Sequence, residues 1–502
     1  MSETEVLIAG AGPTGLVLAL SLVRRGIACR IIDRAAGPGE ASRAMVVQAR
    51  TLELYEGFGI AEGVVARGIR LPAVQLREAG GAVARVALAD LGRGLSPYPF
   101  ALAFPQDEHE RFLVGQLEAA GLAVEWNTEL LGFTETPGGI EARLRRGGEE
   151  TACCAAFLCG CDGAHSRVRE GLGIDFPGGT YRQRFYVADA RIAGPFRTDL
   201  EVNLDPASLA LLFPVRPGQQ RLLGILPAAL DGREAVGFED VRAQAEAQLG
   251  IRVEAVNWFS TYHVHHRVAG RFRAGRAFLA GDAGHIHSPA GGQGMNTGIG
   301  DAVNLAWKLA AVLRGRAAPA LLDSYEAERI GFARSLVRTT DRAFRAAVSP
   351  GRGGRLLRRW VMPHLMPFLA GFAAARHAFF GTISQIRIAY PDSALSEGRA
   401  GGVAGGDRMP WVPGEGGMEG AGAALGWRLV VHGTLSPGLA AAAARLGLEA
   451  VAHPWGEAAE RAGLPRDAAC LLRPDGHVGL AWAGQEPGRL DDYAARHGLA
   501  FR

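Results

Sequence analysis

The chain almost lacks lysine. Lys308 is the only lysine among 54 basic residues, and all the others are arginine. Together with 70 glycines in 502 residues, this indicates a bias in coding composition rather than a function. The formal net charge is only +3, and the arginines form no basic stripe along the sequence, so we expect no nucleic-acid partner.

Cysteines are also few. The six cysteines form no C-x-x-C pair and have no zinc-ligand spacing. Several lie in apolar, strand-like segments, where cysteine is usually a small buried hydrophobic residue. The sequence enters a strand pattern within its first few residues, which leaves no room there for a secretory signal. These features predict a reduced, cytoplasmic protein.

Long hydrophobic runs are missing too. The longest apolar stretch, residues 360–375, is interrupted by Pro363, His364 and Pro367 and ends before Arg376. It is too short and too broken to span a bilayer, so we expect a helical cover over a neighbouring domain and no membrane partner. The hydrophobic content of 48% and charged content of 21% are typical of a soluble globular protein with two to four domains.

A nucleotide-binding pattern is present near the start of the chain. Residues 5–9 read as a buried strand, residues 10–15 read GAGPTG, and a helix pattern runs to Arg25. A second strand over residues 29–32 ends in Asp33. Strand, G-x-G-x-x-G, helix, strand and acid in this order are the dinucleotide fingerprint. Its N-terminal position favours FAD over a nicotinamide nucleotide.

The fingerprint residues have separate expected roles. Gly10 allows the tight turn, Gly12 lets a pyrophosphate approach the backbone, and Gly15 packs the helix against the strand. The carboxylate of Asp33 accepts hydrogen bonds from the adenosine ribose.

A second glycine-rich loop follows another apolar strand. Residues 277–280 form the strand, Gly281-Asp282 follows, and a helix begins near Asn296. Six glycines between Gly281 and Gly298 give backbone that can lie flat against a ligand. The start of the helix offers unpaired N–H groups, and Asp282 is placed to accept hydrogen bonds from ligand hydroxyls.

A third strand ends in the same way. Residues 156–161 are followed by Asp162-Gly163 and by a helix start that carries Ser166 and Arg169. The chain therefore has three strand-end acids in loops of the phosphate-binding kind, and chance would have to produce this arrangement three times.

These motifs resemble those of the FAD-dependent aromatic hydroxylases of the para-hydroxybenzoate hydroxylase fold. The resemblance is carried by GAGPTG with Asp33, by CDGAHSRVR at residues 161–169, and by residues 281–310. It is closest to the phenol- and polyketide-type hydroxylases with an extra C-terminal domain, and it covers residues 1–395 better than the remainder. Gly284 stands where the family more often has alanine, and we expect little consequence.

The resemblance implies an α/β fold with three parts. A Rossmann-like FAD/NAD(P)-binding domain comprises residues 1–177 and 270–395, and a mainly antiparallel β-sheet substrate domain, residues 178–269, is inserted in it. A glycine-rich linker, residues 396–410, leads to a thioredoxin-like α/β domain, residues 411–502.

The resemblance also implies a set of FAD-binding residues. The ADP half is expected at the fingerprint, the ribityl chain at Asp282, and the isoalloxazine along the loop up to Asn296; Gln106 could face a ring edge or cap its helix. The expected cofactor residues are Gly10, Gly12, Pro13, Thr14, Gly15, Asp33, Arg34, Arg43, Gln106, Asp162, Gly281, Asp282, Pro289, Gly291, Gly292, Gly294, Met295 and Asn296.

The expected chemistry is that of the cofactor. By the resemblance, NAD(P)H reduces the flavin, O2 adds at C4a, and the resulting hydroperoxide hydroxylates an electron-rich aromatic substrate. The protein must hold the ring near C4a and exclude water. No second strand–GxGxxG–helix unit is found, so NAD(P)H is expected to dock transiently, and no side chain is identified as a general base.

Residues 178–269 read as alternating strands and are expected to form a sheet over the flavin. Candidate residues of the aromatic substrate pocket are Phe185, Phe213, Phe259, Tyr262 and Pro289, and the pattern leaves open which face of the sheet is turned inward. The cluster His263, His265 and His266 could suggest a metal, but strand alternation divides it between two faces and no carboxylate is near, so no metal site is expected. His285 and His287 are expected to be structural, with the role of His287 left open.

The remaining polar residues are expected to be structural. Asp301, Lys308, Glu328 and Arg329 lie on two helix patterns and are expected to form salt-bridge scaffolding. Residues 474–476, Pro-Asp-Gly, are expected to form a hairpin turn in the C-terminal domain. Without C-x-x-C, thiol exchange is not expected there, and a structural or homodimer-contact role is.

Two other functions share the nucleotide motifs. One is a flavin-dependent oxidase or reductase, which would not consume O2 in step with NAD(P)H and substrate. The other is a flavin-binding partner without turnover, whose flavin NAD(P)H cannot reduce.

Overall fold

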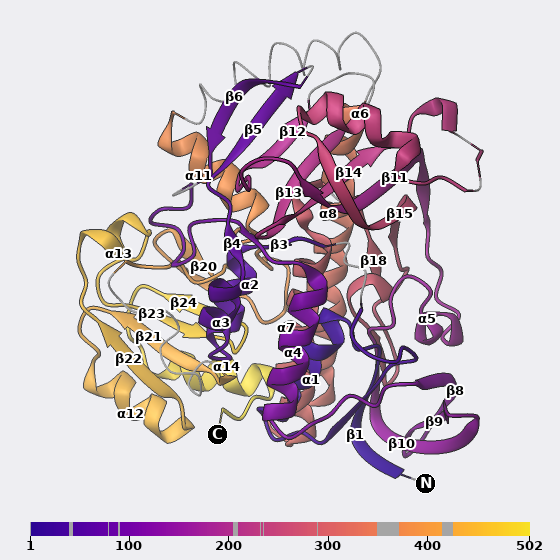
Figure 1. Ribbon diagram of the computed structural model, residues 1–502. Coiled ribbons are helices and arrows are strands. Elements are labelled where there is room, and N and C mark those ends of the chain that lie inside the picture. The colour runs from indigo at the N-terminus through magenta and orange to yellow at the C-terminus, as the bar shows by residue number, and fades with distance from the viewer. Residues whose placement is uncertain are drawn as a thin grey trace.

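The computed structural model describes residues 2–39, 44–78, 80–88, 91–203, 209–230, 232–233, 235–288, 290–348, 371–413 and 425–501. These residues form an α/β structure with sheets of seven, eight, six and three strands (Figure 1). Arg43 and Pro289, two of the predicted site residues, lie outside the described residues, and so do residues 360–370 of the apolar stretch.

The seven-stranded sheet is parallel at its centre, in the order β16-β17-β10-β1-β2; β9 pairs antiparallel with β10, and β8 pairs antiparallel with β9. The side chains of Val6, Leu7 and Ile8 in β1 are 0% exposed, as expected for a parallel strand covered on both faces. Helix α1 (Pro13–Val23) packs against α7 (Gly294–Leu313). The strands are β1 Ser2–Ala9, β2 Cys29–Ile32, β8 Thr128–Thr136, β9 Gly139–Arg146, β10 Glu149–Gly160, β16 Arg273–Ala274 and β17 Ala277–Leu279.

The eight-stranded sheet lies above it in Figure 1, in the order β18-β15-β11-β14-β13-β12-β5-β6. It is mainly antiparallel, and α6 (Glu239–Leu249) covers one face. Strands β5, β6 and β18 come from outside residues 178–269, so the sheet is larger than the predicted insertion. Its strands are β5 Ala73–Glu78, β6 Gly81–Ala87, β11 Gly178–Ile192, β12 Leu200–Asn203, β13 Ala210–Arg216, β14 Gln219–Ile225, β15 Val253–Val268 and β18 His285–Ile286.

A small three-stranded sheet and several helices complete this part of the molecule. The small sheet has the order β3-β7-β4, and its strands are Val46–Val47, Leu102–Ala103 and Ile69–Arg70. The helices are α2 Ala49–Glu56, α3 Ala61–Arg67, α4 Gln106–Ala119, α5 Arg167–Gly171, α8 Asp323–Val348 and α11 Ala373–Ile383.

The C-terminal sheet confirms the thioredoxin-like prediction. Its core order is β24-β23-β21-β22, in which β21 and β22 are parallel and β23 is antiparallel to both of its neighbours. The elements are β21 Arg428–His432, α12 Pro437–Leu446, β22 Glu449–His453, α13 Glu457–Arg461, β23 Ala468–Leu472, β24 Val478–Trp482 and α14 Gly488–His497.

The prediction of a linker over residues 396–410 is wrong. Residues in this range form β19 (Glu397–Ala400) and β20 (Val403–Ala404), and β19 pairs with β24 in parallel. Gly398 has φ +70°, and a Cβ there would collide with the carbonyl oxygen of Ala481. The glycines of this segment therefore allow close backbone approach in a sheet rather than flexibility.

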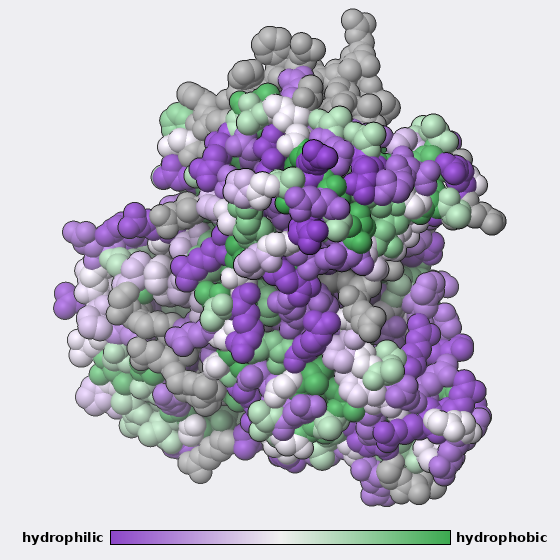
Figure 2. All heavy atoms as spheres, in the orientation of Figure 1, coloured by the Kyte–Doolittle hydropathy of each residue, from purple (hydrophilic) through white to green (hydrophobic). Residues whose placement is uncertain are grey.

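Hydrophilic side chains cover most of the face shown in Figure 2, with small hydrophobic patches between them. Among the described residues, the exposed large hydrophobic side chains are Val83, Phe372 and Phe379. No helix in the described part of the chain is long and apolar enough to cross a membrane.

A buried histidine predicts how stability changes with pH. His109 of α4 is 0% exposed, and its Nε2 lies 2.9 Å from the hydroxyl of Tyr55. Burial lowers the pKa of His109 from 6.5 to about 3. Because the unfolded chain takes up this proton first, the stabilisation by neutral His109 is complete above pH 6.5 and is lost as pH falls towards 3.

We expect His109 to lower the free energy of unfolding by on the order of 1.4 kcal/mol per pH unit below pH 6.5. His109→Gln removes the titrating group, so the decline with pH should be shallower in that variant. Chemical denaturation of both proteins between pH 6.5 and about pH 4 measures the difference. Equal slopes would contradict the assignment.

Candidate active site

The three strand-end acids meet at one edge of the parallel sheet. Ala9 of β1 is paired with Ile32 of β2 and with Gly160 of β10, and Gly160 is paired with Leu279 of β17. These four residues form one rung across the sheet, and the three motifs begin just beyond it. The carboxyl edge of a parallel sheet is where nucleotides bind in doubly wound folds.

The glycines of the first loop are required for different reasons. Gly10 has φ +102°, and a Cβ there would collide with the carbonyl oxygen of Cys161. A Cβ on Gly15 would collide with the carbonyl oxygen of Gly10, so this glycine sets how closely α1 approaches the strand. A Cβ on Gly12 would meet nothing within 4 Å. Gly12 therefore borders open space at the start of α1, where a pyrophosphate fits.

The first loop is fixed to the acid and to the Gly281-Asp282 loop. Asp33 is half-buried, and its carboxylate accepts hydrogen bonds from the amides of Ala11 at 2.7 Å and Ala35 at 2.8 Å. Thr14, which follows Pro13 in the first turn of α1, fills the space beside Gly281, where a Cβ would come within 2.5 Å of its Oγ1. The neighbouring Arg34 is exposed.

The Asp162 loop is held by its own side chains. Ser166 Oγ donates to the Asp162 carboxylate at 2.5 Å, and the amide of Val168 donates to it at 3.2 Å. Burial raises the pKa of Asp162 above its usual value, and these hydrogen bonds oppose the shift. The guanidinium of Arg169 donates to the carbonyls of Ala164 at 2.8 Å and Ala283 at 3.0 Å. Asp162 thus shapes the loop, and Arg169 joins it to the Gly281-Asp282 loop.

Asp301 of α7 anchors the Gly281-Asp282 loop and confirms the predicted scaffolding. Its carboxylate accepts hydrogen bonds from the amide of Gly281 at 3.0 Å and from the Arg329 guanidinium at 2.6 Å, and it lies 2.7 Å from His285 Nε2. Burial alone would raise the pKa of Asp301, but Arg329 and His285 outweigh it and hold the pKa below its usual value. The exposed Asp282 follows directly on this fixed backbone.

The loop that leads into α7 presents backbone amides. Gly291 and Gly292 have φ +77° and +63°, the left-handed region that favours glycine. The amides of Gly294, Met295 and Asn296 lie in the first turn of α7, where no intrahelical acceptor exists. These amides are therefore available to a polar ring edge.

The side chain of Asn296 has a structural task. Its Oδ1 accepts hydrogen bonds from the amide of Gln48 at 2.9 Å and from Thr51 Oγ1 at 2.7 Å. Its Nδ2 donates to the carbonyls of Val46 and Gly292, both at 2.8 Å. Asn296 thus joins the start of α7 to the start of α2, and only its backbone remains for a ligand.

His287 carries a buried nitrogen beside this loop. Its Nδ1 lies 2.8 Å from the carbonyl oxygen of Ser288, while its Nε2 is buried without a hydrogen-bond partner. A Cβ on Gly294 would lie 3.5 Å from that Nε2. Burial lowers the pKa of His287 from 6.5 to about 4, so the ring is neutral at pH 7. An unpaired acceptor here, with the open space at Gly12, fits a bound flavin nucleotide.

Gln106 begins α4 and bonds locally. Its Nε2 donates to Glu110 Oε1 at 2.8 Å, and its Oε1 accepts from the amide of Ala44 at 3.3 Å. Glu110 in turn accepts from the amide of Gly39 at 2.8 Å. The side chain of Gln106 therefore helps to fix the chain on both sides of residues 40–43.

The predicted aromatic pocket residues divide between two faces of the eight-stranded sheet. Phe185 and Tyr262 are cross-strand partners with ring centroids 5.9 Å apart. Phe259 pairs with Ala188 instead, and its ring packs against Tyr186 and Phe238 on the α6 face. Phe259 and Phe185 therefore cannot line one pocket together, because an odd separation along a strand reverses the face.

Phe213 lies on the Phe185 face, together with an ion pair that the sequence did not predict. Phe213 pairs with Arg221, and Arg221 binds Asp189 at 2.6 and 2.7 Å. Arg221 also lies 3.0 Å from the sulfur of Met45, whose neighbour Val46 packs on Gly292. This face is thus turned towards residues Gly291–Asn296, which we call the flavin loop because the family resemblance assigns them to the isoalloxazine. No sequence signal distinguishes these two charges from ordinary surface residues of a strand.

The histidine cluster has other partners. His265 Nδ1 lies 2.8 Å from Thr180 Oγ1, and the ring of His266 lies 4.9 Å from that of Tyr181. Within the described ranges, no group of three or more histidine, cysteine, aspartate or glutamate residues is placed to hold a metal ion.

Comparisons with known proteins agree on one family. The family described as FAD binding domain matches residues 3–340. The 6-methylpretetramide 4-monooxygenase of Streptomyces rimosus is 37% identical over 417 residues, which are 80% of this chain and 72% of that protein. The pentachlorophenol 4-monooxygenase of Sphingobium chlorophenolicum is 34% identical over 361 residues, 70% of this chain and 66% of that protein. The solved anhydrotetracycline hydroxylase of Streptomyces rimosus has a TM-score of 0.79 and 32% identity, covering 100% of this chain and 99% of that one.

A matched pair of glycine variants tests the FAD site. Gly12→Ala places a methyl group in the open space, so we expect FAD affinity to fall at least about 10-fold, or about 1.4 kcal/mol, with little change in the stability of the apoprotein. Gly10→Ala forces a positive φ and a backbone collision, so we expect it to destabilise the apoprotein. FAD titration and thermal unfolding of both apoproteins separate the effects, and an unchanged FAD affinity in Gly12→Ala would refute the placement.

Proposed function

The chain belongs to the FAD-binding family of flavoprotein aromatic hydroxylases, and we propose that its substrate is a polycyclic, polyketide-like phenol. The enzyme is an FAD-dependent monooxygenase that hydroxylates an aromatic ring. When bound, FAD takes electrons from NAD(P)H and activates O2. The residues of the chain bind FAD and the aromatic substrate and orient them towards each other.

We further propose how the cofactor residues divide their tasks. Gly10, Gly12 and Gly15 give the pyrophosphate access to the start of α1, and Asp33 holds the ribose. Asp282 is exposed on an anchored loop and is assigned to the ribityl hydroxyls. The first amides of α7 are assigned to the isoalloxazine edge, where the positive end of the helix dipole favours developing negative charge.

The observation that carries the substrate proposal is the width of the face turned towards the flavin loop. Strands β15, β11, β14 and β13 are neighbours, so side chains on them cover about 14 Å across the sheet. Phe185, Tyr262 and Phe213 supply rings on this face. The buried pair Arg221–Asp189 adds polar groups, which suit a ligand with several hydroxyl and keto oxygens. The similarity to the anhydrotetracycline hydroxylase supports the same class.

The function is tested by adding phenols to the FAD-loaded protein. We expect polycyclic phenols to accelerate NADPH or NADH oxidation more than single-ring phenols do, and the product to gain one oxygen atom. Mass spectrometry and a peroxide assay measure coupling. Reduction without oxygen transfer to any phenol would favour an oxidase or reductase, and a flavin that NAD(P)H cannot reduce would favour a non-catalytic partner.

Two phenylalanine variants test the substrate face. Phe213→Ala should raise the KM for the aromatic substrate several-fold and leave the stability of the protein nearly unchanged, because this side chain is half-buried on the face towards the flavin loop. Phe259 is also half-buried, but its ring packs against Tyr186 and Phe238 under α6, so Phe259→Ala should cost on the order of 1–2 kcal/mol of stability without this effect on KM. Steady-state kinetics and denaturation are the measurements, and the reverse pattern would contradict the assignment of faces.

A further inference from the structure

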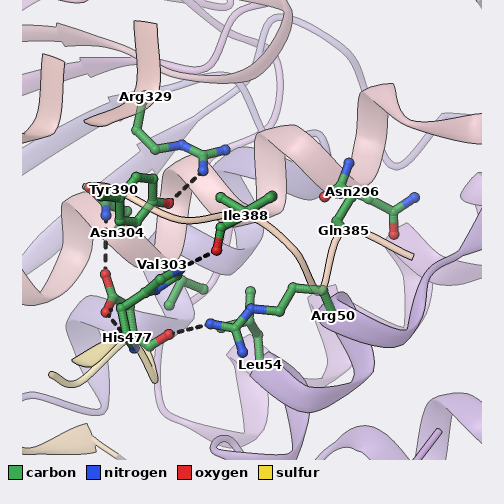
Figure 3. A pocket seen from close by; sticks show the side chains of 12 residues that line it. Arg50, Leu54, Asn296, Val303, Asn304, Arg329, Gln385, Ile388, Tyr390 and His477 are labelled. Carbon is green, nitrogen blue, oxygen red and sulfur yellow. Dashed lines mark hydrogen bonds and ion pairs between the residues drawn. The ribbon is translucent and has the colours of Figure 1, made fainter. Parts of the chain in front are cut away.

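The turn between β23 and β24 enters the FAD-binding part of the molecule. Arg473, Asp475 and His477 are 2%, 3% and 4% exposed, although they belong to a hairpin turn of the C-terminal unit. Figure 3 shows His477 and Arg50 beside residues of α7 and the segment that ends at Tyr390. A hairpin turn normally lies at the surface, so its burial here needs a reason.

One set of contacts holds α7. The Asp475 carboxylate accepts hydrogen bonds from Asn304 Nδ2 at 3.1 Å and from Trp307 Nε1 at 3.2 Å. Arg473 binds Glu328 of α8 through two bonds of 2.7 and 2.8 Å. Burial alone would raise the pKa of Asp475, but Arg473 and His477 outweigh it and hold the pKa well below its usual value. The carboxylate is therefore charged when it holds the helix.

A second set of contacts holds α2. Arg50 Nη2 donates to the carbonyl oxygen of Asp475 at 2.6 Å, and Arg50 Nη1 binds Glu53 at 3.1 Å. Arg50 is 6% exposed. Glu53 has further partners in Arg408 and Ser96, so it stays paired if Arg50 is changed.

Helices α2 and α7 both begin at the flavin loop. Gln48, just before α2, donates its amide to Asn296 Oδ1 at 2.9 Å and its side chain to the carbonyl of Gly291 at 2.9 Å. Thr51 adds a bond of 2.7 Å to the same Asn296 oxygen. Asn296 and the turn line a common cavity of about 20 Å³, and the hydrogen bonds of the turn lead to the loop through α2 and α7.

We propose that the turn Arg473–His477 is a positioning element of the flavin site, and that Arg50 is the positioning residue through which it acts on the loop. The inference rests on the proposed FAD site at Gly291–Asn296. The C-terminal unit then contributes to cofactor binding without touching the cofactor. Coupling of this kind between a remote contact and a binding site is typically five-fold or more in affinity.

The test compares Arg50→Met, Arg50→Lys and Glu397→Gln in the full chain. Methionine keeps much of the volume of Arg50 and removes its donors, so we expect the Kd for FAD to rise on the order of 10-fold and the visible spectrum of the bound flavin to shift. Lysine can still donate to the Asp475 carbonyl and should restore most of the affinity. Glu397 binds Arg496 and His497, and both of these contacts lie within the C-terminal unit. Glu397→Gln therefore serves as the control for domain stability.

FAD titration by fluorescence, flavin absorbance and thermal unfolding of the apoproteins are the readouts. The proposal is supported if Arg50→Met weakens FAD binding more than Glu397→Gln at an equal loss of thermal stability. It is overturned if Arg50→Met leaves the Kd unchanged, or if the control weakens binding equally. A wild-type protein that binds no FAD would overturn the proposed FAD site itself, which is a different result from an unaffected variant.

Discussion

The cofactor site depends on one buried carboxylate. Asp301 lies on α7; its carboxylate accepts hydrogen bonds from the Gly281 amide and from Arg329 of α8, and it also contacts His285. A single anion thus joins α7, α8 and the segment from Gly281 to His285. Removing such a group would leave the Arg329 guanidinium buried without a carboxylate beside it, which is a large penalty in a dry interior. The glycines of the loop at Gly281 allow many backbone conformations, but the bond to Asp301 selects one of them in the folded protein.

Local sequence was sufficient for the nucleotide loops because their geometry depends on neighbours within the motif or on one adjacent strand. The positive φ of Gly10, the close contact at Gly15 and the open space at Gly12 are all consequences of strand, turn and helix in that order. The three acids could be placed for the same reason: a buried strand followed by an acid-glycine step puts the acid at the carboxyl edge of a parallel sheet. The thioredoxin-like order of the last strands was likewise predictable from the family pattern.

The errors concern features that only a distant partner decides. Whether Phe259 shares a face with Phe185 depends on its register with β11, because a shift of one residue reverses the face. Residues 396–410 look like a flexible linker, but Gly398 is needed where β19 approaches β24. The pair Arg221–Asp189 joins residues 32 positions apart. In each case the residue types could be read from the sequence, but the sequence did not show which distant strand pairs with the segment that carries them.

The buried turn of the C-terminal unit shows why burying charge can be worth its cost. Lys308, the only lysine of the chain, is 0% exposed and binds Glu328, which also binds Arg473. Burial lowers the pKa of Lys308 from 10.5 to about 8, so keeping it charged at neutral pH costs on the order of 3 kcal/mol. Apolar residues of similar size would join the two units with less penalty. Hydrogen-bonded charges, however, are satisfied in only one orientation, because a slipped interface would leave each of them buried without a partner. The cost is therefore explained by the fixed position that it imposes on α7 and α8, the two helices that meet at Asp301.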